Sequence, residues 1–294
     1  MRSHFLSAII QRLKGAMIPE IIASVAFSAV VCSVLLFLIF FGESSAVSAD
    51  AGIPAAGRAY LQTLTKKDPA AVDRVLRERR RLTQEKEVLE ETIEKIESGD
   101  VDIWSLYQDY LLLGDSRCKA FSFCRFLQPG FVLAETGSSI YMAFEHLPQI
   151  RAMQPAYVFL CYGINDIASV QWKTGDDYAA VMGDCISRIH DASPDTLIVI
   201  SSILPVTDAV LKRRPEFKKV PSFNDGLKKL CDETSYAVYA DNDDIIEKHK
   251  DLYASDGIHL NAEFYSCWAK NMYISILKNQ ISEKAKEEAS VTVN

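Results

Sequence analysis

Three polar turns in this 294-residue sequence could supply the parts of a nucleophilic serine site. Ser116 follows an apolar run in YLLLGDSRCKAF, Asn165 lies in LCYGINDIAS, and His259 lies in SDGIHLN, three residues after Asp256. A serine hydroxyl is a weak nucleophile and needs an adjacent base, and an acid beside that base can orient it. We therefore interpret Ser116 as a candidate nucleophile. The alternative is an ordinary strand-to-helix turn capped by Asp115 or by Ser116 itself.

Among the five histidines of the chain, His259 is the strongest candidate for the base. It follows an apolar run, and Asp256 is placed to orient its ring and to stabilise the imidazolium. A tetrahedral intermediate also needs hydrogen-bond donors for its oxyanion. The available donors are the backbone N–H of Ser116, the backbone N–H of Gly137 in AETGSS, and the side-chain amide of Asn165.

These turns are predicted to lie on one edge of a parallel sheet. Short apolar runs alternate with helical stretches, which is typical of a parallel sheet covered on both faces. The expected strands are Tyr110–Leu113, Phe131–Ala134, Tyr157–Tyr162, Leu197–Ile200 and Ala237–Tyr239. The expected helices include 178–190, 223–234 and 262–278. Residues 106–294 thus predict one three-layer α/β domain, whose ligands bind beyond the carboxyl ends of the strands.

Residues 21–42 carry no charged side chain and read IIASVAFSAVVCSVLLFLIFFG. A helix of this length spans roughly 33 Å, close to a hydrocarbon core of about 30 Å. Three basic residues precede the run and two acidic residues follow it, namely Arg2, Arg12, Lys14, Glu43 and Asp50. We predict a cytoplasmic N-terminus over 1–20, a transmembrane helix over 21–42 and an extracytoplasmic remainder. A cleaved signal peptide is the alternative, although its apolar core is normally about 7–15 residues.

Residues 43–105 are predicted to form a linker and a charged stalk helix. The helix begins at Asp68-Pro69, an N-cap acid followed by proline, and ends near Ser98-Gly99. Its apolar residues recur every seven positions, at Val75, Leu82, Leu89 and Ile96. This thin seam could join two copies of the chain as a homodimer, or the helix could lie against its own domain.

The four turns together resemble the sequence blocks of the SGNH, or GDSL-type, hydrolase family. They read Gly114-Asp115-Ser116, Gly137, Gly163-Ile164-Asn165-Asp166 and Asp256-Gly257-Ile258-His259, in the family's order. The resemblance covers roughly residues 106–280. It implies a flavodoxin-like, mostly parallel five-stranded sheet, with Ser116 as nucleophile, His259 as base and Asp256 as its partner. It also implies an oxyanion hole of Ser116, Gly137 and Asn165, and no metal or organic cofactor.

Two polar features of the chain have two interpretations each. Arg117 stands where the family commonly has leucine, and we expect either a surface residue of a helix or a rim residue that favours a polar substrate. The basic stretch over 205–221 is either a solvated loop or a loop that overhangs the site.

Charge and cysteine usage restrict the remaining classes of function. The net charge of -7 argues against nucleic acid as a partner. Six of the seven cysteines lie beyond the apolar run, and their spacing matches no zinc pattern. We expect buried free thiols, with disulfides as the alternative. A two-metal phosphoesterase is disfavoured because only one histidine is well placed.

The sequence therefore predicts a membrane-anchored serine esterase of the cell envelope. The expected substrates are small acyl esters or O-acylated polysaccharide, with acetyl esters first. An O-acetyltransferase that uses the same acyl-enzyme is one alternative. A non-catalytic envelope binding module is the other, and the intact Ser116, Asn165 and His259 argue against it.

Overall fold

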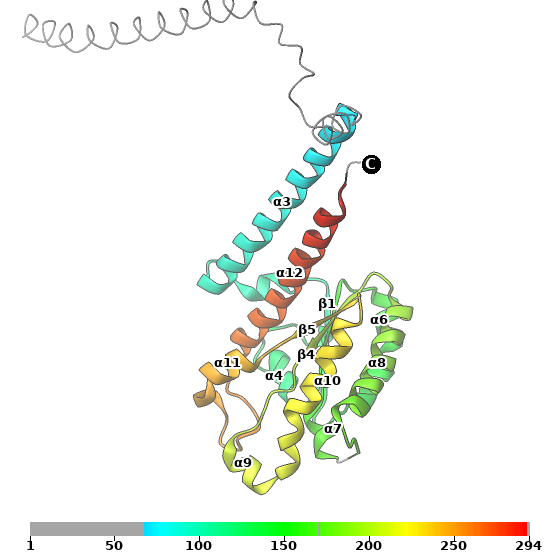
Figure 1. Cartoon of the computed structure of the whole chain (residues 1–294). Helices are drawn as coiled ribbons and strands as arrows, with labels where there is room; N and C mark the ends of the chain where they lie inside the picture. The colour runs from blue at the N-terminus through cyan, green and yellow to red at the C-terminus, as the bar shows by residue number, and fades with distance from the viewer. Residues whose placement is uncertain (1–67, 170, 293–294) are drawn as a thin grey trace, which may run out of the picture. The chain divides into compact units, whose positions relative to one another are not determined.

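The computed structural model describes residues 68–169 and 171–292 of the chain (Figure 1). The predicted transmembrane helix over 21–42 lies outside these residues. Within the described part, no helix is both long enough and apolar enough to cross a membrane.

The described residues alternate strands and helices along the chain, as the sequence pattern predicts. In chain order the elements are α3 (Pro69–Ser98), η1 (Ile103–Leu106), β1 (Tyr110–Gly114), α4 (Ser116–Phe123), η2 (Pro129–Phe131), β2 (Val132–Ala134), α5 (Tyr141–Glu145), α6 (Leu147–Met153), β3 (Tyr157–Cys161), α7 (Ile164–Ala168), α8 (Gly175–Ala192), β4 (Leu197–Ser201), α9 (Asp208–Arg213), η3 (Pro215–Lys219), α10 (Val220–Asp232), β5 (Ala237–Ala240), α11 (Asp243–Lys248), η4 (Lys250–Leu252) and α12 (Phe264–Ser290). Each observed strand end lies within one residue of its prediction.

The five strands form one parallel sheet in the order β2-β1-β3-β4-β5. This is the doubly wound order of flavodoxin-like folds. In the register, Gly114 at the end of β1 pairs with Ala134 of β2 and Cys161 of β3. The three turns that carry Ser116, Gly137 and Asn165 therefore start from the same level of the sheet.

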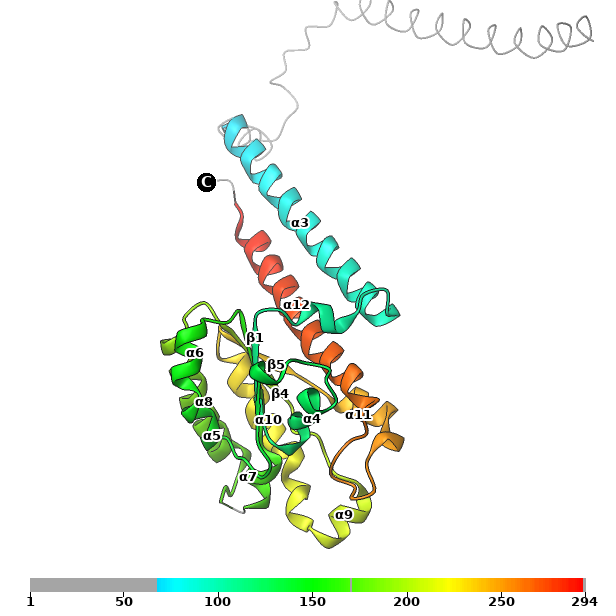
Figure 2. The same ribbon diagram turned by 180° about the vertical axis from the view of Figure 1, so that it is seen from behind.

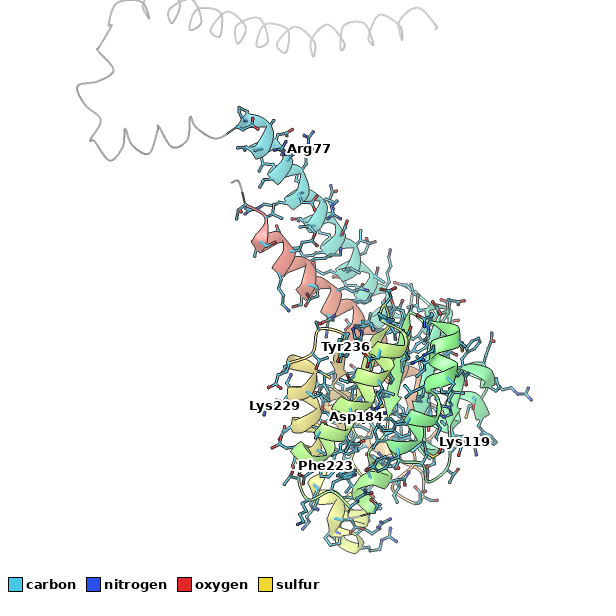
Figure 3. All side chains as sticks on the ribbon, turned by 90° about the vertical axis from the view of Figure 1, so that its right-hand side faces the viewer. Arg77, Lys119, Asp184, Phe223, Lys229 and Tyr236 are labelled. Atoms are coloured by element: carbon cyan, nitrogen blue, oxygen red, sulfur yellow. The ribbon has the colours of Figure 1, made fainter. Side chains whose placement is uncertain are left out.

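Both faces of the sheet are buried, which explains why its strands are apolar throughout. Successive side chains of a strand point to opposite faces. Leu111 and Leu113 accordingly pack with residues of α5, α6, α8 and α10, whereas Tyr110 and Leu112 pack with residues of α4 and α12. Figures 1 and 3 show α8, which carries Asp184, beside α10, which carries Phe223. The result is a three-layer α/β domain.

Helix α3 packs against the C-terminal helix of its own chain. Leu82 and Ile96 are fully buried, and Leu89 and Ile93 lie against the cluster that includes α12. Polar contacts join the two helices as well, including an ion pair between Lys284 and Glu85. Figures 1 and 2 both show α3 beside the end of α12. Two of the four seam residues, Leu82 and Ile96, are thus buried within the chain, in agreement with the second of the two interpretations of this helix.

Helix α12 can reach α3 because it continues for twelve residues past Lys278, its predicted last residue. Its last turns are rich in Lys and Glu and carry no strong apolar pattern, so the sequence offers little signal for them. Contacts with α3 supply the partners there: Glu288 accepts from Lys86 and from Thr83. Helix α3 itself ends as predicted, with Gly99 in the left-handed region at φ +84°.

Residues 205–221 form neither of the two loops expected of them. They fold into α9 and η3 and the start of α10, because Val210, Phe217 and Val220 are buried in the core. The basic side chains that dominate the sequence of this stretch alternate with these apolar anchors.

The six described cysteines are free thiols. Four of them are buried, namely Cys118, Cys161, Cys185 and Cys231. These four behave as small apolar residues of the core.

Candidate active site

Ser116 is the first residue of α4, two residues after Gly114, where β1 ends. Asp115 is the N-cap: its side chain accepts a hydrogen bond from the N–H of Arg117 at 2.9 Å. The strand-to-helix turn is therefore capped by Asp115, as one interpretation of the sequence had it. The same capping leaves Ser116 on the first turn of the helix, where backbone N–H groups have no partner inside the helix.

The structure brings Ser116, His259 and Asp256 into one hydrogen-bonded row. Ser116 Oγ lies 2.9 Å from His259 Nε2, and His259 Nδ1 lies 2.6 Å from Asp256 Oδ2. A carboxylate can only accept, so Nδ1 carries the proton of the neutral ring and Nε2 is free to accept from the serine hydroxyl. This is the arrangement that a serine nucleophile needs for activation.

Asp256 is held by the loop that it orients. Its Oδ1 accepts from the N–H of Ile258 at 2.8 Å and from the N–H of His259 at 2.9 Å. Partial burial acts to raise the pKa of Asp256. The hydrogen bonds from the His259 ring and from the two backbone N–H groups outweigh it and bring the pKa down to about 2. Asp256 is therefore ionised beside His259 across the ordinary pH range.

Gly257 allows the tight turn between these two residues. Its φ of +71° lies in the left-handed region, and a Cβ there would come within 2.2 Å of Thr207 Oγ1. The N–H of Thr207 also donates to the Gly257 carbonyl at 3.0 Å. The loop of His259 therefore rests on the segment that follows β4.

The segment that begins at Gly137 lies between the turns of Ser116 and Asn165. Ser138 Oγ donates to the carbonyl of Gly114 at 2.8 Å, and Asn165 Nδ2 donates to the carbonyl of Ser138 at 2.9 Å. Gly137 has φ +81°, and no backbone hydrogen bond engages its N–H within the described residues. One amide hydrogen of Asn165 remains after its bond to Ser138. The three expected oxyanion donors are thus brought to one edge of the sheet.

Asp166 is a buried carboxylate that holds the backbone of the Gly137 segment at Ile140. The sequence alone did not give it a role separate from that of Asn165. Asp166 is 1% exposed, and its Oδ1 accepts from the N–H of Ile140 at 3.2 Å. Burial raises its pKa to about 6, against the effect of that hydrogen bond, and the charge of Asp115 adds to the rise. Only the position of Asp166 directly after Asn165 hinted at this contribution.

Arg117 corrects both interpretations of its position. It is 3% exposed, so it is neither a surface residue of α4 nor a rim residue that faces substrate. Its guanidinium donates to the carbonyls of Leu204 and Pro205, the second at 3.1 Å. The sequence missed this because the acceptors lie 87 and 88 positions further along the chain.

No group of three or more His, Cys, Asp or Glu side chains within the described residues could hold a metal ion.

A parallel α/β domain with this row of serine, histidine and aspartate at the carboxyl edge of its sheet has the construction of a serine hydrolase. Residues 125–267 match the GDSL-like Lipase/Acylhydrolase family. Residues 125–267 are thus similar to the domain of that family, and the chain is an enzyme that acts on ester bonds. The matched segment includes Asn165, Asp256 and His259 and begins nine residues after Ser116, so Ser116 is placed by its contact with His259.

Several solved structures are similar to the chain. A family 3 carbohydrate esterase from Clostridium thermocellum is 14% identical, with a TM-score of 0.46 over 59% of this chain and 97% of that one. A carbohydrate esterase family 3 protein from Talaromyces cellulolyticus is 16% identical, with a TM-score of 0.44 over 59% and 98%. A GDSL-like lipase from Bacteroides thetaiotaomicron is 16% identical, with a TM-score of 0.41 over 59% and 87%. No curated protein sequence matches.

Proposed function

We propose that this protein is an extracytoplasmic serine esterase that hydrolyses acyl esters, acetyl esters first among them, on carbohydrate of the cell envelope. The observation that carries the proposal is the 2.9 Å contact between Ser116 Oγ and His259 Nε2. Asp256 supports it, since its ionised carboxylate fixes the tautomer that this contact requires.

In the proposed mechanism, Ser116 Oγ attacks the acyl carbonyl while His259 Nε2 takes its proton. The N–H groups of Ser116 and Gly137 and the amide of Asn165 stabilise the oxyanion of the tetrahedral intermediate. Collapse of the intermediate breaks the ester C–O bond. The proton on His259 then leaves with the alcohol, and the acyl group stays on Ser116. Water, deprotonated by His259, attacks this acyl-enzyme. The bond to Ser116 Oγ then breaks, His259 returns the proton to Oγ, and the carboxylic acid leaves.

The location rests on the apolar run over 21–42 and on the basic residues that precede it. We place the catalytic domain outside the membrane, joined to the anchor through α3. In Figure 1, α7 and α9, which follow the carboxyl ends of β3 and β4, lie at the end of the domain away from the start of α3. We expect an envelope polymer to reach the site from this end of the domain.

Homodimerisation through α3 is a separate expectation, and a single-chain mass by light scattering would exclude it.

One feature near the site favours a carbohydrate alcohol. Tyr141 starts α5, directly after the segment held by Asn165 and Asp166, and it is 45% exposed. Its ring centroid lies 6.0 Å from that of Trp172. A supported, exposed aromatic ring offers a flat surface to the apolar face of a sugar.

Two other functions use the same fold. An O-acetyltransferase would resolve the same acyl-enzyme with a sugar hydroxyl in place of water. A binding module would hold the ester without breaking it, and it would not need the row of Ser116, His259 and Asp256.

The test uses the full-length protein, purified in detergent, with acetyl, butyryl and octanoyl p-nitrophenyl esters. Turnover that is highest with acetyl and is lost in Ser116→Ala and His259→Ala supports the esterase. Acetylated product from an added oligosaccharide indicates the transferase. Turnover that survives in Ser116→Ala contradicts the proposed nucleophile.

A further inference from the structure

Arg117, the residue next to Ser116, carries a charge inside the protein. A buried charge is stable only when hydrogen bonds and an opposite charge replace water. Its guanidinium has both: it donates to the carbonyls of Leu204 and Pro205, and the carboxylate of Asp115 lies nearby. Burial lowers the pKa of Arg117 and the charge of Asp115 opposes this shift. The backbone of Arg117 is held as well, because its carbonyl accepts from Tyr265 Oη at 2.7 Å.

The two carbonyls that Arg117 binds belong to the segment that supports His259. Tyr253 Oη donates to the carbonyl of Pro205 at 2.8 Å, so Pro205 receives hydrogen bonds from Tyr253 and Arg117 together. Two residues further on, the N–H of Thr207 donates to the carbonyl of Gly257. Residues 204–207 therefore contact the nucleophile helix on one side and the loop of the base on the other.

Tyr253 links residues 204–207 to the loop that carries His259. It forms an antiparallel bridge with Leu260, the residue after His259. Beside the bridge, the N–H of Ala254 donates to the carbonyl of His259 at 2.8 Å. The hydroxyl of Tyr253 and the backbone of His259 are thus parts of one small, hydrogen-bonded unit.

We propose that Arg117 is a positioning residue, which holds Ser116 in register with His259 through residues 204–207. The inference rests on the proposed function. Ser116 and His259 are 143 positions apart in the chain, and one hydrogen bond of 2.9 Å joins their side chains. Arg117 ties the first segment to the carbonyls of 204–205, and Tyr253 and Gly257 tie the second to the same stretch.

The chemistry of the guanidinium suits this task better than other side chains. Its planar fork presents several N–H groups at fixed angles and can reach two successive carbonyls at once. Lysine offers one ammonium group on a flexible stem. Leucine offers no donor. It would leave the Leu204 carbonyl without its side-chain partner, the Pro205 carbonyl with Tyr253 alone, and Asp115 without the nearby positive charge.

The test measures kcat and KM of the full-length protein with p-nitrophenyl acetate, and the rate at which a fluorophosphonate labels Ser116. In Arg117→Leu we expect kcat to fall about 10- to 100-fold, because a small displacement of reacting groups costs that much. The labelling rate should fall by a similar factor, and KM should stay within about twofold. Arg117→Lys should recover part of the loss. The matched control is Lys119→Leu, which removes an exposed cation from the same helix (Figure 3) and should leave kcat unchanged.

A second variant, Tyr253→Phe, tests the same connection with the buried charge in place. We expect a smaller fall in kcat, about fivefold for one hydrogen bond. The effects of Arg117→Lys and Tyr253→Phe should not add, since both act on the carbonyl of Pro205. If Arg117→Leu does not fold, these two variants decide the question.

The outcomes separate this inference from the proposed function. A lowered melting temperature with an unchanged kcat in the folded enzyme would mean that Arg117 only stabilises the fold, and it would overturn the positioning role. Wild-type protein that neither turns over ester nor reacts with the fluorophosphonate would overturn the proposed function itself.

Discussion

Ser116 Oγ lies 2.9 Å from His259 Nε2, although the two residues stand 143 positions apart in the chain. Serine comes from the turn after β1 and histidine from the loop before α12. Their meeting depends on the parallel sheet, which places both turns at its carboxyl edge. Proton transfer at this contact runs from Ser116 Oγ to His259 Nε2, because Asp256 holds the proton of the neutral ring on Nδ1.

The first prediction concerns Asp256. In Asp256→Asn, the amide can no longer stabilise an imidazolium and can favour the wrong tautomer of His259. We expect kcat on p-nitrophenyl acetate to fall by about 10²–10⁴ with a small change in KM, as for the equivalent change in serine proteases. The matched control is the nearby Asp251→Asn, which should leave kcat unchanged. A loss below about threefold would remove Asp256 from the mechanism.

The second prediction concerns the oxyanion donors. Removal of the amide in Asn165→Ala should lower kcat by about 10²–10³, since it takes one donor from the transition state. KM should change less, because the ground-state carbonyl uses this donor weakly. Steady-state kinetics across ester chain lengths provide the measurement. An equal effect on KM, with kcat preserved, would assign Asn165 to substrate binding.

The third prediction is a dependence of stability on pH. The pKa of Asp166 is about 6 in the folded protein, against about 3.9 in an unfolded chain. The folded state therefore binds more protons between about pH 4 and pH 6, so the contribution of Asp166 to stability falls as pH rises through that window. The full effect is up to about 3 kcal/mol.

Asp166→Asn cannot ionise and should lose this dependence. We expect the melting temperature of the variant, relative to wild type, to rise between pH 4 and pH 7. Calorimetry at matched ionic strength provides the measurement. A difference between variant and wild type that stays constant with pH would contradict the raised pKa.

The fourth prediction concerns the packing of α3. Leu82 is fully buried, and Leu82→Ala should lower the free energy of unfolding by about 2–5 kcal/mol. Val88, on the same helix, is 61% exposed, and Val88→Ala should change it by less than about 0.5 kcal/mol. Urea denaturation of the two variants provides the comparison. Equal effects would mean that α3 does not pack on α12 as described.

The positions of the strands could be predicted from the sequence because burial on both faces makes each strand a continuous apolar run. Tyr110–Gly114 and Leu197–Ser201 are examples. The turns of the candidate site were also visible, since polar residues directly after such runs must share one edge of the sheet. Their chemical types then predicted which side chains would meet.

The contacts of Arg117 and α3 could not be predicted in the same way. An arginine on a short helix is exposed in most proteins, and only the carbonyls of Leu204 and Pro205 make its burial possible. The apolar seam of α3 predicts an apolar partner but does not identify it. The partner is the last turns of α12, and their sequence carries no strong apolar pattern from which the contact could be predicted.

The most direct test of the central claim is the reaction of Ser116 with a fluorophosphonate. Wild-type protein, incubated with the probe at neutral pH, should carry one label on the peptide that contains Ser116, identified by mass spectrometry. The label should be absent in Ser116→Ala and strongly reduced in His259→Ala, and the same variants should lose acetyl ester turnover. An unlabelled Ser116 in folded wild-type protein would contradict an activated serine and with it the proposed esterase.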